Sequence, residues 1–253
     1  MQPPPLENLL AVGAICVFIA GVSYRRNLLD GAGLVAAVAI GLVIGILGDP
    51  AWLFVLLVYL VSSFAATRYR FQRKMEMGVA EGRRGERTWH NVVANGLPPA
   101  AVAAVWGLAP DLLPASSSGL LFLSAIAVAA ADTLASEIGV LSPNAVLITR
   151  PLRRVPPGTD GGVSLLGTAA ALAASGYVAG VGYLVLALLA PATMPASPAL
   201  LLIPVALGFL GCQLDSLMGA TLERSGRLGK GGVNFISISA ATVVAWLALA
   251  AMP

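Results

Sequence analysis

The stretch SGLLFLSAIAVAAADTLASEIGVL, residues 118–141, decides the fold class of this chain. Residues 118–131 carry no charge, and the whole stretch exceeds the roughly 20 residues that a helix needs to cross a bilayer. Two acids, Asp132 and Glu137, follow within it. A carboxylate is costly in hydrocarbon and persists mainly where it pairs, binds a metal or lines a wet cavity. The stretch therefore predicts a membrane-spanning helix that carries functional groups in its second half.

Similar apolar stretches occur along the rest of the chain. The eight predicted spans cover residues 6–23, 31–47, 51–66, 91–108, 118–141, 163–190, 198–222 and 233–252. Composition agrees, because 58% of the 253 residues are hydrophobic and only 11% are charged, too few for the surface of a soluble domain. The sequence predicts an all-α polytopic transmembrane bundle of about eight spans, in a single integral membrane domain over residues 1–253.

The basic residues indicate how the bundle is oriented. All 15 Lys and Arg residues lie after the first, third, fifth and seventh spans: Arg25, Arg26, Arg68, Arg70, Arg73, Lys74, Arg83, Arg84, Arg87, Arg150, Arg153, Arg154, Arg224, Arg227 and Lys230. Basic residues are enriched in cytosolic loops. The pattern predicts cytosolic loops at 67–90, 142–162 and 223–232, with both termini on the outer side. The net charge of +3 is explained by basic residues that face anionic lipid headgroups, so it does not require a nucleic-acid partner.

Acids in two spans predict a site on the cytosolic side. The fifth span carries Asp132 and Glu137, and the seventh carries Asp215 and Glu223 at a similar predicted depth. Facing carboxylates could bind Mg²⁺, which prefers oxygen ligands and often bridges to phosphate. Asp132 and Glu137 diverge by about 140° on a straight helix, so either the helix unwinds near Gly139 or the two acids have separate roles. Alternatively, Asp132 or Asp215 hydrogen-bonds a neighbouring helix or pairs with Arg150 or Lys230.

Two Gly-rich connections and the start of the fourth span supply candidate phosphate contacts. Cations and glycines just before a helix can hold phosphate oxygens through side chains and backbone N–H groups. The candidates are Arg153, Arg154, Gly158, Thr159, Asp160, Gly161, Gly162, Lys230, Asn234, Asn91 and Asn95. Such a turn is a weak signal by itself, and it does not match the P-loop pattern. We consider this signal because the acids of the fifth and seventh spans are predicted to lie nearby.

Four stretches together resemble one polytopic family: DTLASEIG at 132–139, PGTDGGVS at 157–164, GCQLDSLMGATL at 211–222 and NVVANG at 91–96. The family contains the phytyl-phosphate kinases of plants, animal transmembrane protein 19 and many uncharacterised prokaryotic members. Asp160 stands where the family pattern often has Asn, and Leu134 where it often has an aromatic residue. The resemblance covers residues from about 28 to the last span.

The resemblance implies a kinase that converts an isoprenyl monophosphate, like phytyl or geranylgeranyl phosphate, to the diphosphate, with CTP as the expected donor. The mechanistic hypothesis assigns Asp132, Glu137 and Asp215 to catalysis and, with Glu223, to Mg²⁺ binding. The active face would be cytosolic, in the cell membrane of a prokaryote. A transporter or flippase for an isoprenoid or anionic solute is the alternative, because intramembrane acids also mark transport paths. A purely structural role explains the acids least well. The oligomeric state and prenyl chain length stay open.

Overall fold

The computed structural model describes residues 5–82, 84–113, 115–195 and 197–252; Arg83 of the third connection lies outside them. Its helices are α1 (Leu6–Arg26), α2 (Gly31–Val43), α3 (Trp52–Arg68), α4 (Phe71–Glu76), α5 (Trp89–Leu108), α6 (Ala115–Gly139), α7 (Leu165–Leu189), α8 (Leu202–Met218) and α9 (Lys230–Ala250). Single π-helical turns, η1 (Ile44–Gly48) and η5 (Gly219–Glu223), extend α2 and α8. Short 3₁₀ turns are η2 (Pro110–Leu112), η3 (Pro191–Thr193) and η4 (Pro198–Leu201).

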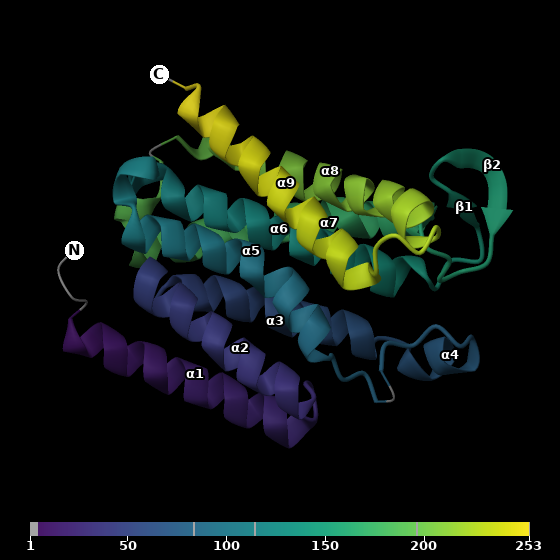
Figure 1. Ribbon diagram of the computed structural model, residues 1–253, viewed down its shortest axis with the longest axis horizontal. Helices are drawn as coiled ribbons and strands as arrows, with labels where there is room; N and C mark the ends of the chain where they lie inside the picture. Colours follow the sequence, from purple (N-terminus) through teal and green to yellow (C-terminus); the bar gives the residue numbers. More distant parts are fainter. Residues whose placement is uncertain (1–4, 83, 114, 196, 253) are drawn as a thin grey trace.

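The predicted spans correspond to long helices lying side by side (Figure 1). Among the described residues, six segments are long and apolar enough to cross a membrane: Leu6–Arg26, Gly31–Gly48, Ser116–Gly139, Leu165–Leu189, Pro198–Glu223 and Lys230–Ala250. Of the remaining two predicted spans, α3 is apolar but has 17 residues, and α5 begins with His90, Asn91 and Asn95 in its first two turns. The chain is therefore a polytopic helical membrane protein, and the count of about eight spans is approximate.

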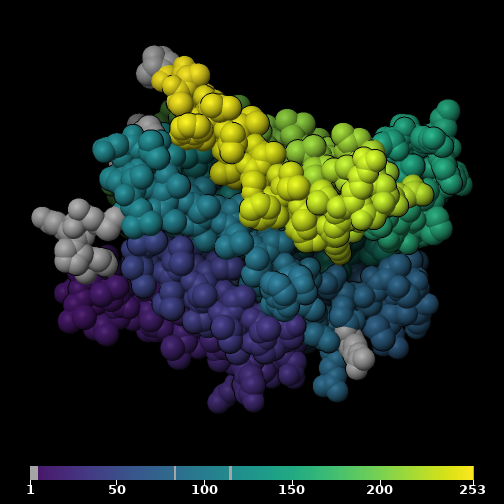
Figure 2. Space-filling view, viewed as in Figure 1, coloured from purple at the N-terminus to yellow at the C-terminus, as the bar shows by residue number. Residues whose placement is uncertain are grey.

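Helix α6, which contains the stretch 118–139, is the central helix of the bundle. In its most apolar window 89% of the residues are buried, against 17% in α1. It packs against α3, α5, α7, α8 and α9, and Figures 1 and 2 show α1 and α2 on one side of it and α8 and α9 on the other. Small residues allow this crowding: a Cβ added to Gly211 of α8 would lie 2.6 Å from Val128 Cγ1 of α6.

The basic connections gather at one end of the bundle. Helices α1, α3, α6 and α8 finish there and α2, α5, α7 and α9 begin there, whereas α1 begins and α9 ends at the opposite end (Figure 1). We call this the loop end, formed by residues 27–30, 69–82, 84–88, 140–164 and 224–229. The backbone of Arg87 ties two of these connections together, because its N–H donates to Leu28 O and its carbonyl accepts from Asp30 N. The charge pattern thus corresponds to one physical end of the molecule.

A small antiparallel sheet, which the sequence did not predict, stands at the loop end of the helical bundle. Its strands are β1 (Ala145–Leu147), β2 (Arg150–Val155) and β3 (Gly162–Val163), in the order β2-β1-β3. Val146 pairs with Arg154 on one side and with Val163 on the other. The predicted loop 142–162 is therefore ordered by strand pairing, and β3 leads directly into α7. A connection of this length satisfies its backbone groups by pairing with itself.

Candidate functional site

Two carboxylates from different helices meet inside the loop end of the bundle. Asp132 of α6 is buried, and the Asp215 carboxylate of α8 lies within hydrogen-bonding distance of it. Helix α9 supports both acids: Asn234 Nδ2 donates to Asp132 Oδ2 at 3.2 Å, and Ser237 Oγ donates to Asp215 Oδ2 at 3.1 Å. Asn234 and Ser237 are three residues apart and so share one helix face. We call these acids the paired carboxylates.

The paired carboxylates open onto a cavity of about 280 Å³ at the loop end, which we call the polar cavity. Most of the residues predicted from sequence line it: Asp132, Glu137, Gly158, Thr159, Asp160, Gly161, Gly162, Asp215, Glu223, Lys230 and Asn234. The first turns of α7 and α9 also border it, through Ser164 and Thr168 and through Lys230 and Asn234. Helix N-termini favour anions. The polar cavity therefore combines carboxylates, one lysine and two anion-favouring helix starts.

The glycine loop, residues 157–162, is shaped by positive φ angles and by close contact with η5. Gly158 has φ +81° and Gly161 has φ +71°, a region that favours glycine. A Cβ on Gly161 would collide with the backbone of Ala220 in η5. The π-helical turn and the glycine loop thus form one wall of the polar cavity. A π-helical turn within a helix is frequent at functional sites.

We expect Gly161→Ala to lower both stability and binding of the nucleotide that the resemblance implies, because the added Cβ strains the positive φ and displaces the loop from Ala220. Gly226→Ala is the matched control, since Gly226 also has φ +71° but has nothing within 4 Å of its Cβ position. Strain at positive φ alone costs about 1–3 kcal/mol. Thermal denaturation in detergent and nucleotide titration measure the two effects. Equal losses in both variants would contradict a role for the Ala220 contact.

Glu81, in the third connection, joins two predicted phosphate contacts. Its Oε1 accepts from Asn91 Nδ2 at 2.7 Å, and its Oε2 forms an ion pair with Lys230 Nζ at 3.5 Å. Burial raises the pKa of Glu81, but Lys230, Asn91 and Arg87 outweigh it and hold the pKa below its ordinary value of 4.5. Sequence reasoning missed Glu81, because nothing in a charged, Gly-containing loop distinguishes it from Glu76 or Glu86.

Because folding lowers the pKa of Glu81, its carboxylate stabilises the fold above pH 4.5 and loses this contribution as pH falls through the lowered value. We expect Glu81→Gln to melt below the unchanged protein at pH 7, with the difference shrinking on acidification. Glu76→Gln, at an exposed position of the same connection, serves as the control. Melting temperatures measured across this pH range test the assignment. A difference that persists at acid pH contradicts it.

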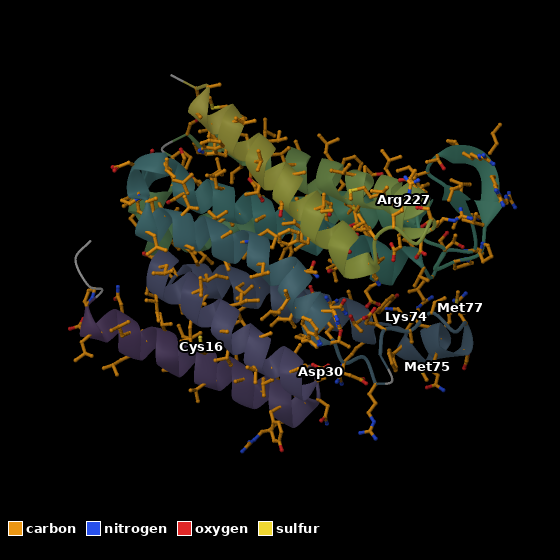
Figure 3. The ribbon with its side chains drawn as sticks, in the orientation of Figure 1. Cys16, Asp30, Lys74, Met75, Met77 and Arg227 are labelled. Atoms are coloured by element: carbon orange, nitrogen blue, oxygen red, sulfur yellow. The ribbon has the colours of Figure 1, made fainter. Side chains whose placement is uncertain are left out.

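Glu137 has different partners from the paired carboxylates, although it also borders the polar cavity. Its Oε2 forms a 2.6 Å ion pair with Lys74 Nζ, and its Oε1 accepts from Thr67 Oγ1 at 2.8 Å. Lys74, on α4 (Figure 3), is fully buried and also donates to the carbonyls of Ala66 and Thr67. Helix α6 continues unbroken to Gly139. The structure thus gives Asp132 and Glu137 separate surroundings on one regular helix.

Other predicted contacts lie outside the polar cavity. Arg153 and Arg154 are exposed on β2 and do not line it. Asn91 and Asn95 line a smaller cavity of about 30 Å³, which we call the neck; Asp132, Lys230 and Asn234 border it as well. The neck therefore connects the asparagines of α5 to the paired carboxylates. Arg87 also lines the neck.

The predicted four-acid metal cluster is not assembled. Within the described residues, no group of three or more His, Cys, Asp or Glu side chains is placed to hold a metal ion. The paired carboxylates alone still fit Mg²⁺, which commonly takes one or two carboxylates and completes its shell with water and substrate phosphates. Asp132 and Asp215 are therefore the two residues that could hold the ion. Glu137 forms an ion pair with Lys74, and Glu223 lines the cavity from η5.

Comparisons with known proteins agree with the membrane assignment. A family model described as integral membrane protein DUF92 matches residues 14–244. The chain is 28% identical to uncharacterized membrane protein MJ0933 of Methanocaldococcus jannaschii, over 94% of both chains. It is 30% identical to protein PGR of Arabidopsis thaliana, over 89% of this chain and 83% of that one. It is also 30% identical to the chloroplastic protein VTE6 of Arabidopsis thaliana, over 92% and 69%. No solved structure matches.

Proposed function

Because the chain belongs to the integral membrane protein family DUF92, we propose that it is a membrane-embedded kinase acting on an isoprenyl monophosphate. The terminal phosphoryl group of a nucleoside triphosphate, CTP by preference, passes to a phosphate oxygen of the lipid. The products are the nucleoside diphosphate and the isoprenyl diphosphate. The observation that carries the proposal is the meeting of Asp132 and Asp215 beside the glycine loop and Lys230.

Two kinds of similarity support the substrate class. The 30% identity to VTE6 supports a prenyl-phosphate-related function in the membrane. The motifs at 132–139, 157–164 and 211–222 resemble those of phytyl-phosphate kinases, and they supply the paired carboxylates and the glycine loop. Three of the four stretches that carry the resemblance thus line the polar cavity.

Phosphoryl transfer requires positioning and charge neutralisation more than covalent chemistry. In the polar cavity Lys230, the glycine-loop backbone and the starts of α7 and α9 would hold the donor phosphates. Asn234 fixes the Asp132 carboxylate and Ser237 fixes that of Asp215. A phosphate monoester has its second pKa at about 6 and is mostly deprotonated at neutral pH, so the acceptor needs no strong general base.

Mg²⁺ would be held by Asp132 and Asp215 and would supply charge neutralisation between the donor and acceptor phosphates. Within the protein, the low exposure of Asp132 keeps bulk water from competing for these groups. Lys230 places a cation at the same cavity, and Glu81 holds that cation through its ion pair.

The loop end is proposed to face the cytosol, since it carries the basic connections. A water-soluble nucleotide would then reach the polar cavity from the cytosol, while the isoprenoid chain stays among the helices. In a prokaryote the enzyme would then lie in the cell membrane.

The direct test is an assay of the purified protein with Mg²⁺, a nucleotide and a series of prenyl monophosphates. CTP and ATP are compared in parallel reactions, and the diphosphate is identified by chromatography and mass spectrometry. We expect Mg²⁺-dependent diphosphate with an equal amount of nucleoside diphosphate. Proteoliposomes carrying the same lipids test transport alongside. Nucleotide-independent movement of lipid without diphosphate would overturn the kinase proposal in favour of a transporter or flippase.

A further inference from the structure

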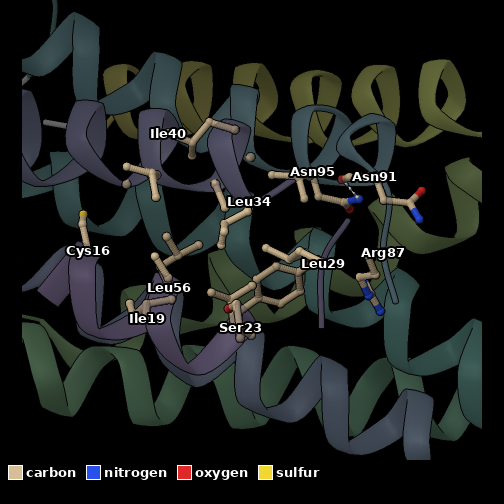
Figure 4. A pocket seen from close by; sticks show the side chains of 18 of the residues that line it. Cys16, Ile19, Ser23, Leu29, Leu34, Ile40, Leu56, Arg87, Asn91 and Asn95 are labelled. Atoms are coloured by element: carbon tan, nitrogen blue, oxygen red, sulfur yellow. Dashed lines mark hydrogen bonds between the residues drawn. The ribbon is translucent and has the colours of Figure 1, made fainter. Parts of the chain in front are cut away.

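A second cavity lies deeper in the bundle, among α1, α2, α3 and α5 (Figure 4). Its volume is about 70 Å³, and apolar side chains such as Ile19, Leu34, Ile40 and Leu56 form most of its wall. We call it the apolar cavity. Helix α1 is the outermost helix on this side (Figure 1). An occupant of the apolar cavity would therefore lie between α1 and the inner helices, within the membrane-spanning part of the bundle.

One end of the apolar cavity is polar. Arg87, Asn91 and Asn95 line this end, and the same three residues line the neck. The neck in turn shares Asp132, Lys230 and Asn234 with the polar cavity. Three cavities therefore follow one another, from an apolar chamber through an arginine and two asparagines to the paired carboxylates.

Two buried polar atoms at this junction have no hydrogen-bond partner within the described part of the chain. They are Arg87 Nε and Asn95 Oδ1. Asn95 is buried, and its Nδ2 donates a hydrogen bond to Asn91 O at 2.8 Å. The Arg87 guanidinium makes a 3.3 Å bond to Thr67 Oγ1 and lies over the Phe64 ring, but it forms no ion pair with any described acid. Buried polar groups left without partners are uncommon and call for an explanation.

We propose that the apolar cavity holds the isoprenoid chain of the lipid substrate and that Arg87 binds its phosphate at the neck, facing Asp132 and Lys230. This inference rests on the proposed function and assigns the acceptor subsite within it. An anionic phosphate would supply acceptors for the guanidinium of Arg87. The flexible apolar chain would fill a chamber that offers it no polar partner. Donor and acceptor would then approach the paired carboxylates from opposite sides.

The test is direct binding of labelled prenyl monophosphates to the purified protein without nucleotide. Ala37 of α2 lines the apolar cavity, so Ala37→Phe fills it; Ala39→Phe is the matched control, because Ala39 is exposed on another face of the same helix. We expect Ala37→Phe to weaken binding of geranylgeranyl monophosphate about tenfold or more. Binding of the five-carbon dimethylallyl monophosphate should change much less. Equal chain-length dependence in the two variants overturns the assignment.

A second variant tests the phosphate end. Arg87→Gln should weaken binding of geranylgeranyl monophosphate about tenfold to a hundredfold, and leave binding of the uncharged alcohol geranylgeraniol unchanged. Equal losses for both ligands would overturn the role of Arg87, since they would indicate a general disturbance of the cavity. Thermal denaturation of each variant confirms that the protein binding the ligand is folded.

The two proposals fail in different ways. If the protein binds prenyl monophosphates with the expected chain-length dependence but forms no diphosphate, the kinase proposal falls and the lipid subsite stands. If diphosphate forms and Ala37→Phe keeps the chain-length preference of Ala39→Phe, the kinase proposal stands and the lipid subsite falls.

Discussion

Asp215→Asn is expected to lower phosphoryl transfer by about a hundredfold or more, the scale seen when one preorganised electrostatic group is removed from an active site. The amide keeps the size of the side chain and can still accept from Ser237, but it removes one of the two charges proposed to bind Mg²⁺. Asp132→Asn should behave similarly, because Asn234 holds the Asp132 carboxylate at the same site. Initial rates at saturating nucleotide and lipid measure the loss.

The stability of Asp215→Asn, unlike its activity, should stay unchanged or increase. Two carboxylates at hydrogen-bonding distance, one buried and one partly buried, repel each other, so replacing one by an amide removes a like-charge contact. We therefore expect Asp215→Asn to melt at the same temperature as the unchanged protein or higher, as found where function requires a destabilising site. Asp111→Asn, on the turn η2 at the opposite end, is the control for removing one acid. Full activity in Asp132→Asn and Asp215→Asn would exclude both acids from the mechanism.

The bundle and its loop end could be predicted from sequence because each depends on a local property. Span position follows from uninterrupted hydropathy, and the gathering of loops at one end follows from which connections carry basic residues. The meeting of Asp132 and Asp215 follows from the same logic, since α6 and α8 run in the same direction and carry their acids at similar depth. The glycine loop follows from glycines that precede a helix, two of which adopt positive φ.

The features that could not be predicted from sequence depend on contacts between segments that are far apart in the chain. Lys74 reads as one of several loop cations, yet it is buried against Glu137, 63 residues away. Arg153 and Arg154 look like phosphate contacts by charge, but strand pairing in β2 leaves them exposed. Glu81 and Arg87 acquire their positions only when the third connection folds back onto α5 and α9. The periodicity of a sequence indicates which residues share a helix face, but it does not indicate which other segment packs against that face.

Lys74→Met is expected to destabilise the protein more than any of the other single substitutions, because it leaves Glu137 as a buried charge without its counter-ion. Breaking a buried pair in this way typically costs about 3–5 kcal/mol. Lys74 also donates to the carbonyls of Ala66 and Thr67 at the end of α3, and these acceptors lose their partner as well. A large drop in melting temperature in detergent is the expected result.

The double variant Lys74→Met/Glu137→Met separates a structural Glu137 from a metal-binding one. Replacing both members of a buried pair by apolar side chains is often neutral or stabilising, so most of the lost stability should return. If Glu137 serves only to bind Lys74 and Thr67, the double variant keeps transfer activity well above that of Asp215→Asn. If Glu137 binds the catalytic ion, the double variant recovers its stability but has activity as low as that of Asp215→Asn. The contacts of Glu137 with Lys74 and Thr67 occupy both of its carboxylate oxygens and favour the first outcome.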